Sequence, residues 1–290
     1  MNAPLTLPKN IAIFGPGLLG GSMLLALRER LPGTHLRVWA RREAALAAVR
    51  DRQLAEVAST DLTPVLDGAE LLILCTPVET MPALAAQIAA ASGSAPDCVV
   101  TDVGSVKAPV VSALEDAFAR SNYRFVGSHP MAGSERAGLE AARKDLFQQA
   151  ACLLTPTLFT ESAALDTVRA FWELLGCRVL EMSPEDHDRK VARISHLPHV
   201  AAAVTALAAL HDDPSAAACA GNGFRDTTRV AAGDPGLWTG ILLENRSEVI
   251  ASLRAARDRF DELLAILENV DDRALHHFLQ EAKLLRDQVS

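Results

Sequence analysis

The stretch Ile11-Ala-Ile-Phe-Gly15-Pro-Gly-Leu-Leu-Gly20 joins a short apolar run to a turn with the spacing Gly-x-Gly-x-x-Gly. In a dinucleotide-binding fold the first glycine allows a tight turn, and the second lets the backbone approach a pyrophosphate. The third lets the following helix pack on the strand, so that its N-terminal N–H groups face the phosphates. The stretch therefore predicts a dinucleotide site formed by Gly15, Pro16, Gly17, Leu18, Leu19 and Gly20, the alternative being a turn that binds nothing.

The first half of the chain alternates short apolar runs with helical patterns. This alternation indicates βαβ units and a Rossmann-type, doubly wound parallel sheet. The predicted strands are residues 11–14, 36–39, 71–75, 98–102, 125–128, 150–155 and 178–182. The predicted helices between them are residues 18–31, 42–50, 78–91, 107–119 and 161–175.

From residue 183 onward only helical patterns occur, at residues 184–210, 235–270 and 271–289. We expect an NAD(P)-binding domain at 1–182, a boundary near Met182, and an all-helical substrate and dimerisation domain at 183–290. The spacing of Phe260, Leu263, Leu264 and Leu267 is typical of an amphipathic helix. These long helices offer more apolar surface than a lone bundle needs, so we predict a homodimer.

Composition excludes several classes of protein. Of the 290 residues 49% are hydrophobic and 22% are charged, which is ordinary for a globular protein and argues against disorder. The net charge is −8 and no Lys or Arg run offsets it, so a non-specific nucleic-acid binder is not expected. An anionic small substrate remains open, because a pocket needs only one or two local cations.

The five cysteines lie singly, which indicates neither a disulfide framework nor a zinc site. The N-terminal MNAPLTLPKN lacks the charged and apolar regions of a signal peptide. The apolar stretch at residues 200–210 is too short to span a bilayer, which takes about 18 or more residues. We therefore expect a cytoplasmic protein with no membrane partner.

The end of the second predicted strand bears on cofactor choice. An acidic residue there would hold the ribose 2′-hydroxyl of NAD. The sequence instead has Ala40, Arg41 and Arg42, with no carboxylate before Glu43. Guanidinium groups suit a 2′-phosphate, so NADP is favoured and NAD is possible, unless the two arginines merely begin a solvated helix. Two residues after another strand, Thr76 and Pro77, complete the predicted cofactor site.

Four further segments carry a family resemblance: residues 102–107 (DVGSVK), 128–134 (SHPMAGS), 195–199 (SHLPH) and 223–229 (GFRDTTR). Together they resemble the prephenate/arogenate (cyclohexadienyl) dehydrogenase family of tyrosine biosynthesis. The resemblance implies a Rossmann domain, an all-helical dimerisation domain and an NAD(P) cofactor. It also implies oxidative decarboxylation of prephenate to 4-hydroxyphenylpyruvate, or of arogenate to tyrosine. Nothing in the sequence tells these two substrates apart.

Within this resemblance His129 is the expected catalytic base. It stands just past a predicted strand end, where open α/β sheets bind ligands, and a neutral imidazole can take the proton of the substrate hydroxyl near pH 7. Ser105 is the second expected catalytic residue, as a hydrogen-bond partner near the nicotinamide or the hydroxyl. Its alternative role is to cap the helix that starts near Lys107.

The resemblance implies that Arg229 holds a substrate carboxylate, with Arg225 as a competitor and Asp226 and Trp238 as orienting or closing groups. It also implies substrate contacts from His199 and, more weakly, His196. An HxxH pair could bind a metal, but no third ligand has convincing spacing, so none is expected. At about 100° per residue, His187 and His196 fall on opposite faces of a regular helix. They can share a pocket only if Pro198 or an earlier break redirects the chain, so His187 is assigned to an interface.

Two alternatives stay open from the sequence. One is another two-domain NADP-dependent dehydrogenase of the β-hydroxyacid type, and the other is a non-catalytic nucleotide sensor. After the helical region we expect no added regulatory domain. Feedback by tyrosine, if it occurs, is therefore expected to act at the active site.

Overall fold

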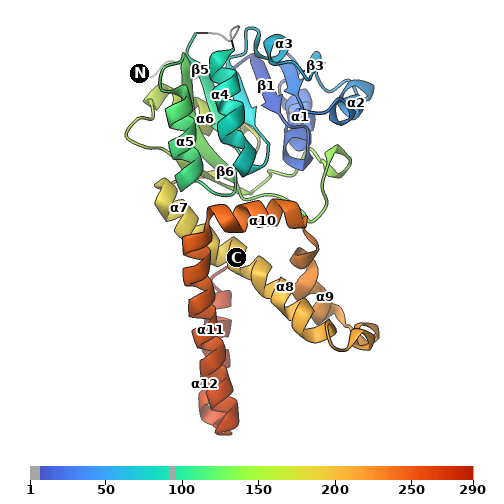
Figure 1. Cartoon of the computed structure of the whole chain (residues 1–290), viewed down its shortest axis with the longest axis vertical. Helices are drawn as coiled ribbons and strands as arrows, with labels where there is room; N and C mark the ends of the chain where they lie inside the picture. Colours follow the sequence, from blue (N-terminus) through green and yellow to red (C-terminus); the bar gives the residue numbers. More distant parts are fainter. Residues whose placement is uncertain (1–6, 92–95, 290) are drawn as a thin grey trace. The chain divides into compact units, whose positions relative to one another are not determined.

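The computed structural model describes residues 7–91 and 96–289. The strands between residues 10 and 181 form an eight-stranded sheet, drawn in the upper part of Figure 1. The strand order is β3-β2-β1-β4-β5-β6-β7-β8. β6 and β7 pair antiparallel and all other neighbours pair parallel, which confirms the predicted doubly wound sheet. The strands are β1 (Asn10–Phe14), β2 (His35–Trp39), β3 (Val57–Ser59), β4 (Leu71–Leu74), β5 (Cys98–Asp102), β6 (Tyr123–Pro130), β7 (Ala151–Thr155) and β8 (Arg178–Glu181).

Helices cover both faces of the sheet because alternate strand residues point to opposite sides. Ile11 and Ile13 of β1 pack in a core with α1, α2 and α6. Ala12 and Phe14 belong to a second core with α3, α4 and α5. These helices are α1 (Leu18–Arg30), α2 (Ala44–Asp51), α3 (Leu62–Leu66), α4 (Met81–Ala90), α5 (Ala108–Phe118) and α6 (Ser162–Leu174).

Two strands differ from expectation. β3 was not predicted, because it is only three residues long and half-buried, and so carries no clear apolar run. β6 continues two residues past its predicted end, since Pro130 and His129 pair with Cys152 and Leu153 of the antiparallel β7. His129 is therefore the second-last residue of β6 and does not lie beyond the end of the strand.

The predicted helix at residues 184–210 is broken into α7 (Pro184–Val191), a π-helical turn η3 (Ala192–His196) and α8 (Leu197–Leu210). Pro198 has no N–H and crowds the preceding turn, which disfavours regular helix at this point. The Leu197 N–H instead reaches the Ala192 carbonyl, a bond that closes a wider turn. The chain continues through η4 (Pro214–Cys219), α9 (Asn222–Thr228), η5 (Arg229–Ala232) and α10 (Pro235–Glu244).

The chain forms two compact units, residues 1–245 and 246–290. The second is a helical hairpin of α11 (Arg246–Glu268) and α12 (Asp272–Arg286), so the predicted helix at 235–270 is interrupted at Asn245. The domain boundary near Met182 stays a prediction. None of the described helices is both long and apolar enough to cross a membrane. Residues 1–6, on which the absence of a signal peptide was partly judged, lie outside the described residues.

Candidate active site

The glycine turn lies between β1, β2 and β4, at the edge where their carboxyl ends meet. Gly15 has a φ of +106°, and a Cβ there would lie 2.8 Å from the Cys75 carbonyl oxygen. A Cβ on Gly20 would collide with the Gly15 carbonyl, whereas one on Gly17 would meet nothing within 4 Å. Gly15 and Gly20 are thus required by the protein's own packing, and Gly17 leaves open space above the turn.

The surroundings of this turn fit a dinucleotide. The Thr76 hydroxyl is enclosed yet has no hydrogen-bond partner in the described part of the chain. Arg41 and Arg42 are exposed at the end of β2, and the described residues give their side chains neither a hydrogen bond nor an ion pair. The nearby Glu43 is paired with Arg50 instead. An unused hydroxyl, open backbone and two available cations are what a phosphorylated cofactor would use.

A buried polar network fixes the next loop along this edge. The Asp102 carboxylate accepts hydrogen bonds from the Gly104 N–H (2.8 Å) and from the Ser128 N–H (3.1 Å). It also forms an ion pair with Lys107, and both partners are fully buried. The network holds the loop carrying Ser105, which is half-buried, against the strand that carries His129.

His129 contacts a second histidine. The His129 Nδ1 lies 2.8 Å from the His187 Nε2, and the His187 Nδ1 lies 2.8 Å from an Asp188 carboxylate oxygen. His129 is 7% exposed and His187 is fully buried. The His129 Nε2 has no hydrogen-bond partner among the described residues. It is not enclosed by the protein and reaches solvent. Burial, followed by the neighbouring charges, lowers the pKa of both imidazoles, and both are neutral at pH 7.

Asp188 caps α5 from the helical part of the chain. Its two carboxylate oxygens accept hydrogen bonds from the backbone N–H groups of Lys107 (2.7 Å) and Ala108 (2.8 Å). These are the first amides of α5, which need an acceptor and favour a negative charge. The capping role considered for Ser105 is therefore wrong, because the acceptor comes from a residue 80 positions away.

The break in the helix explains where the other histidines lie. His196, at the end of the π-helical turn, is fully buried, and its Nδ1 lies 3.2 Å from the Asn245 side-chain nitrogen. Burial lowers the pKa of His196 to about 4. His199, one turn later, stacks on Trp238 with ring centroids 3.4 Å apart. Among the described residues no group of three or more His, Cys, Asp or Glu is arranged to hold a metal ion.

His187 does not lie on an exposed surface open to a second chain, because it is fully buried between the sheet and the helical region of the first unit. The wide π-helical turn redirects the chain before Pro198, so His187 and His196 are both enclosed within the first unit. A break at or before Pro198 was the condition under which the sequence allowed His187 and His196 to share one pocket. His187 contacts His129, and Asn245 joins His196 to the Asp188 carbonyl.

Arg229 is tied to the loop that follows His129. Its guanidinium lies 2.8 Å from the Glu135 carboxylate, and its side chain is 59% exposed. Arg225 and Asp226 are also exposed, but the described residues give neither side chain a partner. The carboxylate that orients Arg229 is therefore Glu135 rather than Asp226. Glu135 directly follows the motif at residues 128–134. This adjacency was the only feature of the sequence that could have pointed to Glu135 as a site residue.

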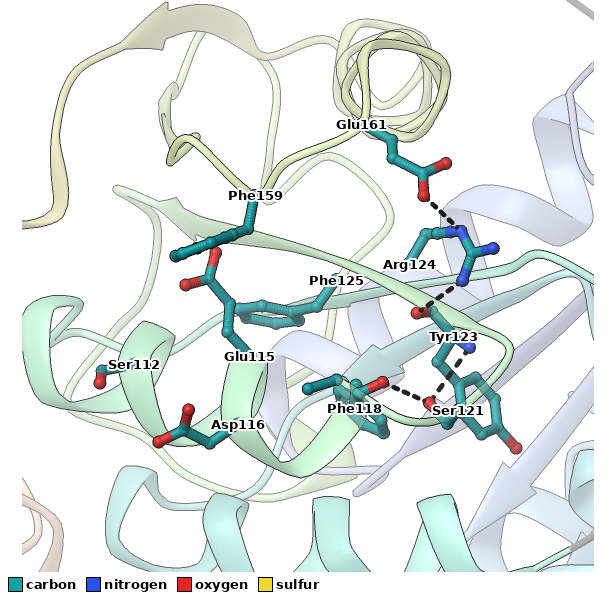
Figure 2. Close-up of a pocket in the computed structure, with 11 residues that line it drawn as sticks. Ser112, Glu115, Asp116, Phe118, Ser121, Tyr123, Arg124, Phe125, Phe159 and Glu161 are labelled. Carbon is teal, nitrogen blue, oxygen red and sulfur yellow. Dashed lines mark hydrogen bonds and ion pairs between the residues drawn. The ribbon is translucent and has the colours of Figure 1, made fainter.

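A separate cavity of about 460 Å³ lies at the other edge of the sheet, near the start of β6 and the end of α5 (Figure 2). Its charged groups are largely engaged with one another or with neighbouring residues. Arg124 pairs with Glu161 and with Asp97, and Glu115 accepts a hydrogen bond from Thr157. None of the predicted site residues lines this cavity, so it is distinct from the site around His129.

Family models match both parts of the chain. The nucleotide-binding domain of prephenate dehydrogenase matches residues 24–181, and the prephenate dehydrogenase dimerization domain matches residues 183–281. The chain belongs to the prephenate dehydrogenase family. It is thus an NAD(P)-dependent oxidoreductase of tyrosine biosynthesis with a helical dimerisation domain.

Individual relatives agree with this assignment. A prephenate dehydrogenase of Bacillus subtilis is 34% identical over 96% of this chain and 75% of its own length. A cyclohexadienyl dehydrogenase of Zymomonas mobilis is 34% identical over 96% of both chains. The solved prephenate dehydrogenase from A. aeolicus, in complex with hydroxyphenyl propionate and NAD+, superposes with a TM-score of 0.89 at 30% identity, covering 97% of this chain and 98% of that chain.

Proposed function

We propose that this member of the family oxidises and decarboxylates prephenate or arogenate at the His129 site. The observation that carries the proposal is the state of His129. Its Nδ1 is engaged by His187, it is neutral, and its Nε2 reaches solvent. A neutral imidazole nitrogen that reaches solvent can accept the proton of a substrate hydroxyl.

His129 would accept the proton of the substrate hydroxyl and donate it back to the product within one turnover. As the carbon bearing the 4-hydroxyl loses hydride, His129 Nε2 accepts the proton of that hydroxyl. The bond from the ring to its carboxylate then breaks, CO₂ leaves, and its electron pair makes the ring aromatic. The phenolate oxygen takes the proton back from His129, so the reaction needs no net proton. A bound nicotinamide dinucleotide would supply the acceptor for the hydride.

Other residues of the chain bind and orient. Arg229 holds a substrate carboxylate, because a planar guanidinium can donate two hydrogen bonds to it. His199 contacts the substrate beside Trp238, and Ser105 donates or accepts a hydrogen bond near the reacting hydroxyl. His196 is also assigned to the substrate site, although its complete burial favours support of that site over direct contact.

For the cofactor we favour NADP over NAD. Gly15, Pro16, Gly17, Leu18, Leu19 and Gly20 would hold the pyrophosphate, with Thr76 and Pro77 beside them. Ala40, Arg41 and Arg42 would surround the 2′-phosphate. The guanidinium groups of Arg41 and Arg42, which have no partner among the described residues, support this preference together with the pairing of Glu43 with Arg50.

Three further assignments belong to the same proposal. The functional domains divide near Met182, a position supported by the junction between the two matched family domains. The chain acts as a homodimer joined through its helical domain. It works in the cytoplasm, where its five unpaired cysteines would stay reduced.

The test is an initial-rate assay at 340 nm that crosses prephenate and arogenate with NADP and NAD. We expect turnover with at least one substrate, faster with NADP, and a loss of about 10²–10⁴-fold in kcat for His129→Asn. His211→Asn, at an exposed position outside the site, serves as the matched control. Absence of turnover in all four combinations would overturn the proposed substrates, and full activity of His129→Asn would overturn the base.

A further inference from the structure

We propose that His187 is a positioning residue that sets the tautomer of His129. By accepting the Nδ1 proton of His129, it leaves the lone pair of that ring at Nε2, on the side open to solvent. The inference rests on the proposed function, in which His129 is the base, and it assigns a separate role to a residue that does not itself touch the substrate.

The direction of each hydrogen bond follows from the Asp188 end of the chain of contacts. Both Asp188 oxygens accept backbone N–H groups at the start of α5, where an ionised carboxylate is favoured. An ionised carboxylate only accepts hydrogen bonds, so the His187 Nδ1 must carry a proton. The neutral ring then has its lone pair at Nε2. Since this nitrogen lies 2.8 Å from the His129 Nδ1, the latter must donate.

The surroundings keep one proton on each ring. The charged and titratable groups around His187 are His129 from β6, Asp188 from its own helix, Lys107 at the start of α5, and His196 from the π-helical turn. The Lys107 cation and burial both disfavour a second proton on His187. With no second proton, the two hydrogen bonds can point only from His129 to His187 to Asp188.

The position of His187 is held from both sides. Asn245 donates a hydrogen bond to the Asp188 carbonyl (2.9 Å), and the Asp188 side chain is anchored on α5. His187 is therefore fixed between the sheet, through His129 and α5, and the helical region through Asn245. A base whose ring is fixed in rotation and tautomer loses less activity to unproductive arrangements.

The competing explanation is that His187 only fills space, and substitutions separate the two. The amide of Gln at position 187 can still offer an oxygen to the His129 Nδ1, whereas Leu fills the space without an acceptor. We expect His187→Leu to lower kcat by about 10–100-fold, with KM changed less than about twofold, and His187→Gln to keep most of the activity. Equal kcat for the Leu and Gln variants would overturn the proposal.

A second measurement needs neither substrate nor a stable variant at position 187. In ¹⁵N-histidine NMR spectra of the wild-type protein, the signals of residue 129 are assigned by their loss in His129→Asn. We expect the Nδ1–H tautomer in the wild type and, where the variant folds, a mixture of tautomers in His187→Leu. A wild-type His129 protonated at Nε2 would overturn the inference. Because no substrate is present, that result is distinguishable from failure of the proposed reaction.

Discussion

At the scale of single residues, the site depends on imidazoles that are buried without charge. His129, His187 and His196 lie together at the junction of the sheet and the helices, and each has its pKa lowered chiefly by burial. Neutral rings suit a base that must accept a proton. They also make the folded state sensitive to acid, because the same rings take up protons readily once they are exposed.

We predict that the free energy of unfolding falls as the pH drops below about 6.5, the ordinary pKa of histidine. In this range the unfolded chain binds protons at His129, His187 and His196, whereas the folded chain does not. Each residue can then remove up to about 1.4 kcal/mol per pH unit, and His196 stops contributing near its folded pKa of about 4. Urea unfolding at pH 7.5, 6.5 and 5.5 measures how the free energy of unfolding changes with pH, and His196→Asn should reduce this change. Equal stability at all three pH values would contradict the assigned direction.

The pair of exposed arginines near the end of α9 gives a matched comparison for substrate binding. Arg229 is oriented by Glu135, whereas the described residues give the Arg225 side chain no partner. We expect Arg229→Ala to raise the KM for the substrate by about 10–100-fold, the equivalent of a charged hydrogen bond worth roughly 1.5–3 kcal/mol. Arg225→Ala should change KM by less than about threefold. The reverse order would assign the carboxylate to Arg225.

At the scale of elements, the glycine turn and the π-helical turn set the positions of the functional groups. The turn after β1 brings the backbone of Gly17 to an open edge of the sheet. The π-helical turn before Pro198 encloses His187 and His196 within one unit although they are nine residues apart. The geometry of each turn depends on a few residues, so single substitutions can test it.

Two glycines of the same turn should respond differently to alanine. Gly20→Ala would force a methyl group against the Gly15 carbonyl, so we expect it to destabilise the protein by about 1–3 kcal/mol. Gly17→Ala has free space and an extended backbone, so the melting temperature should change little. The added methyl would instead keep a pyrophosphate from the backbone and weaken NADP binding. Thermal unfolding with and without NADP distinguishes the two effects, and equal melting temperatures for both variants would contradict the packing argument.

At the scale of the whole molecule, the large apolar side chains that are exposed lie mainly on the helices. Exposed large apolar side chains of the helical hairpin include Phe260, Leu264, Leu267, Leu279, Leu284 and Leu285. Apolar surface of this extent favours association with another surface. The match to a dimerization domain covers these helices as far as residue 281.

We predict a solution mass of twice the 30.9 kDa chain mass, measured by light scattering at micromolar concentration. Replacing Leu264 and Leu267 together by Glu should shift the mass toward that of a single chain, because burying two unpaired carboxylates is unfavourable. Glu268→Gln, at the exposed end of the same helix, is the control and should stay dimeric. A wild-type protein of monomer mass would contradict the dimer.

Local patterns were sufficient to predict the sheet, the glycine turn and His129. Strands of four or five buried residues and a Gly-x-Gly-x-x-Gly turn depend on neighbours within a few positions, so the sequence alone determined them. The motifs at residues 102–107, 128–134, 195–199 and 223–229 were equally sufficient for the family. β3 escaped prediction because three half-buried residues form no clear pattern.

Tertiary structure alone decided which side chains meet. Asp188 reaches the start of α5 across 80 positions, Glu135 reaches Arg229 across 94, and His187 reaches His129 across 58. Regular-helix geometry separated His187 from His196 unless a break redirected the chain, and only the fold shows that break, the π-helical turn before Pro198. Contacts of this range depend on how the sheet and helices pack as a whole. The proposed base, His129, was therefore visible in the sequence, whereas the groups that contact it became visible only in the fold.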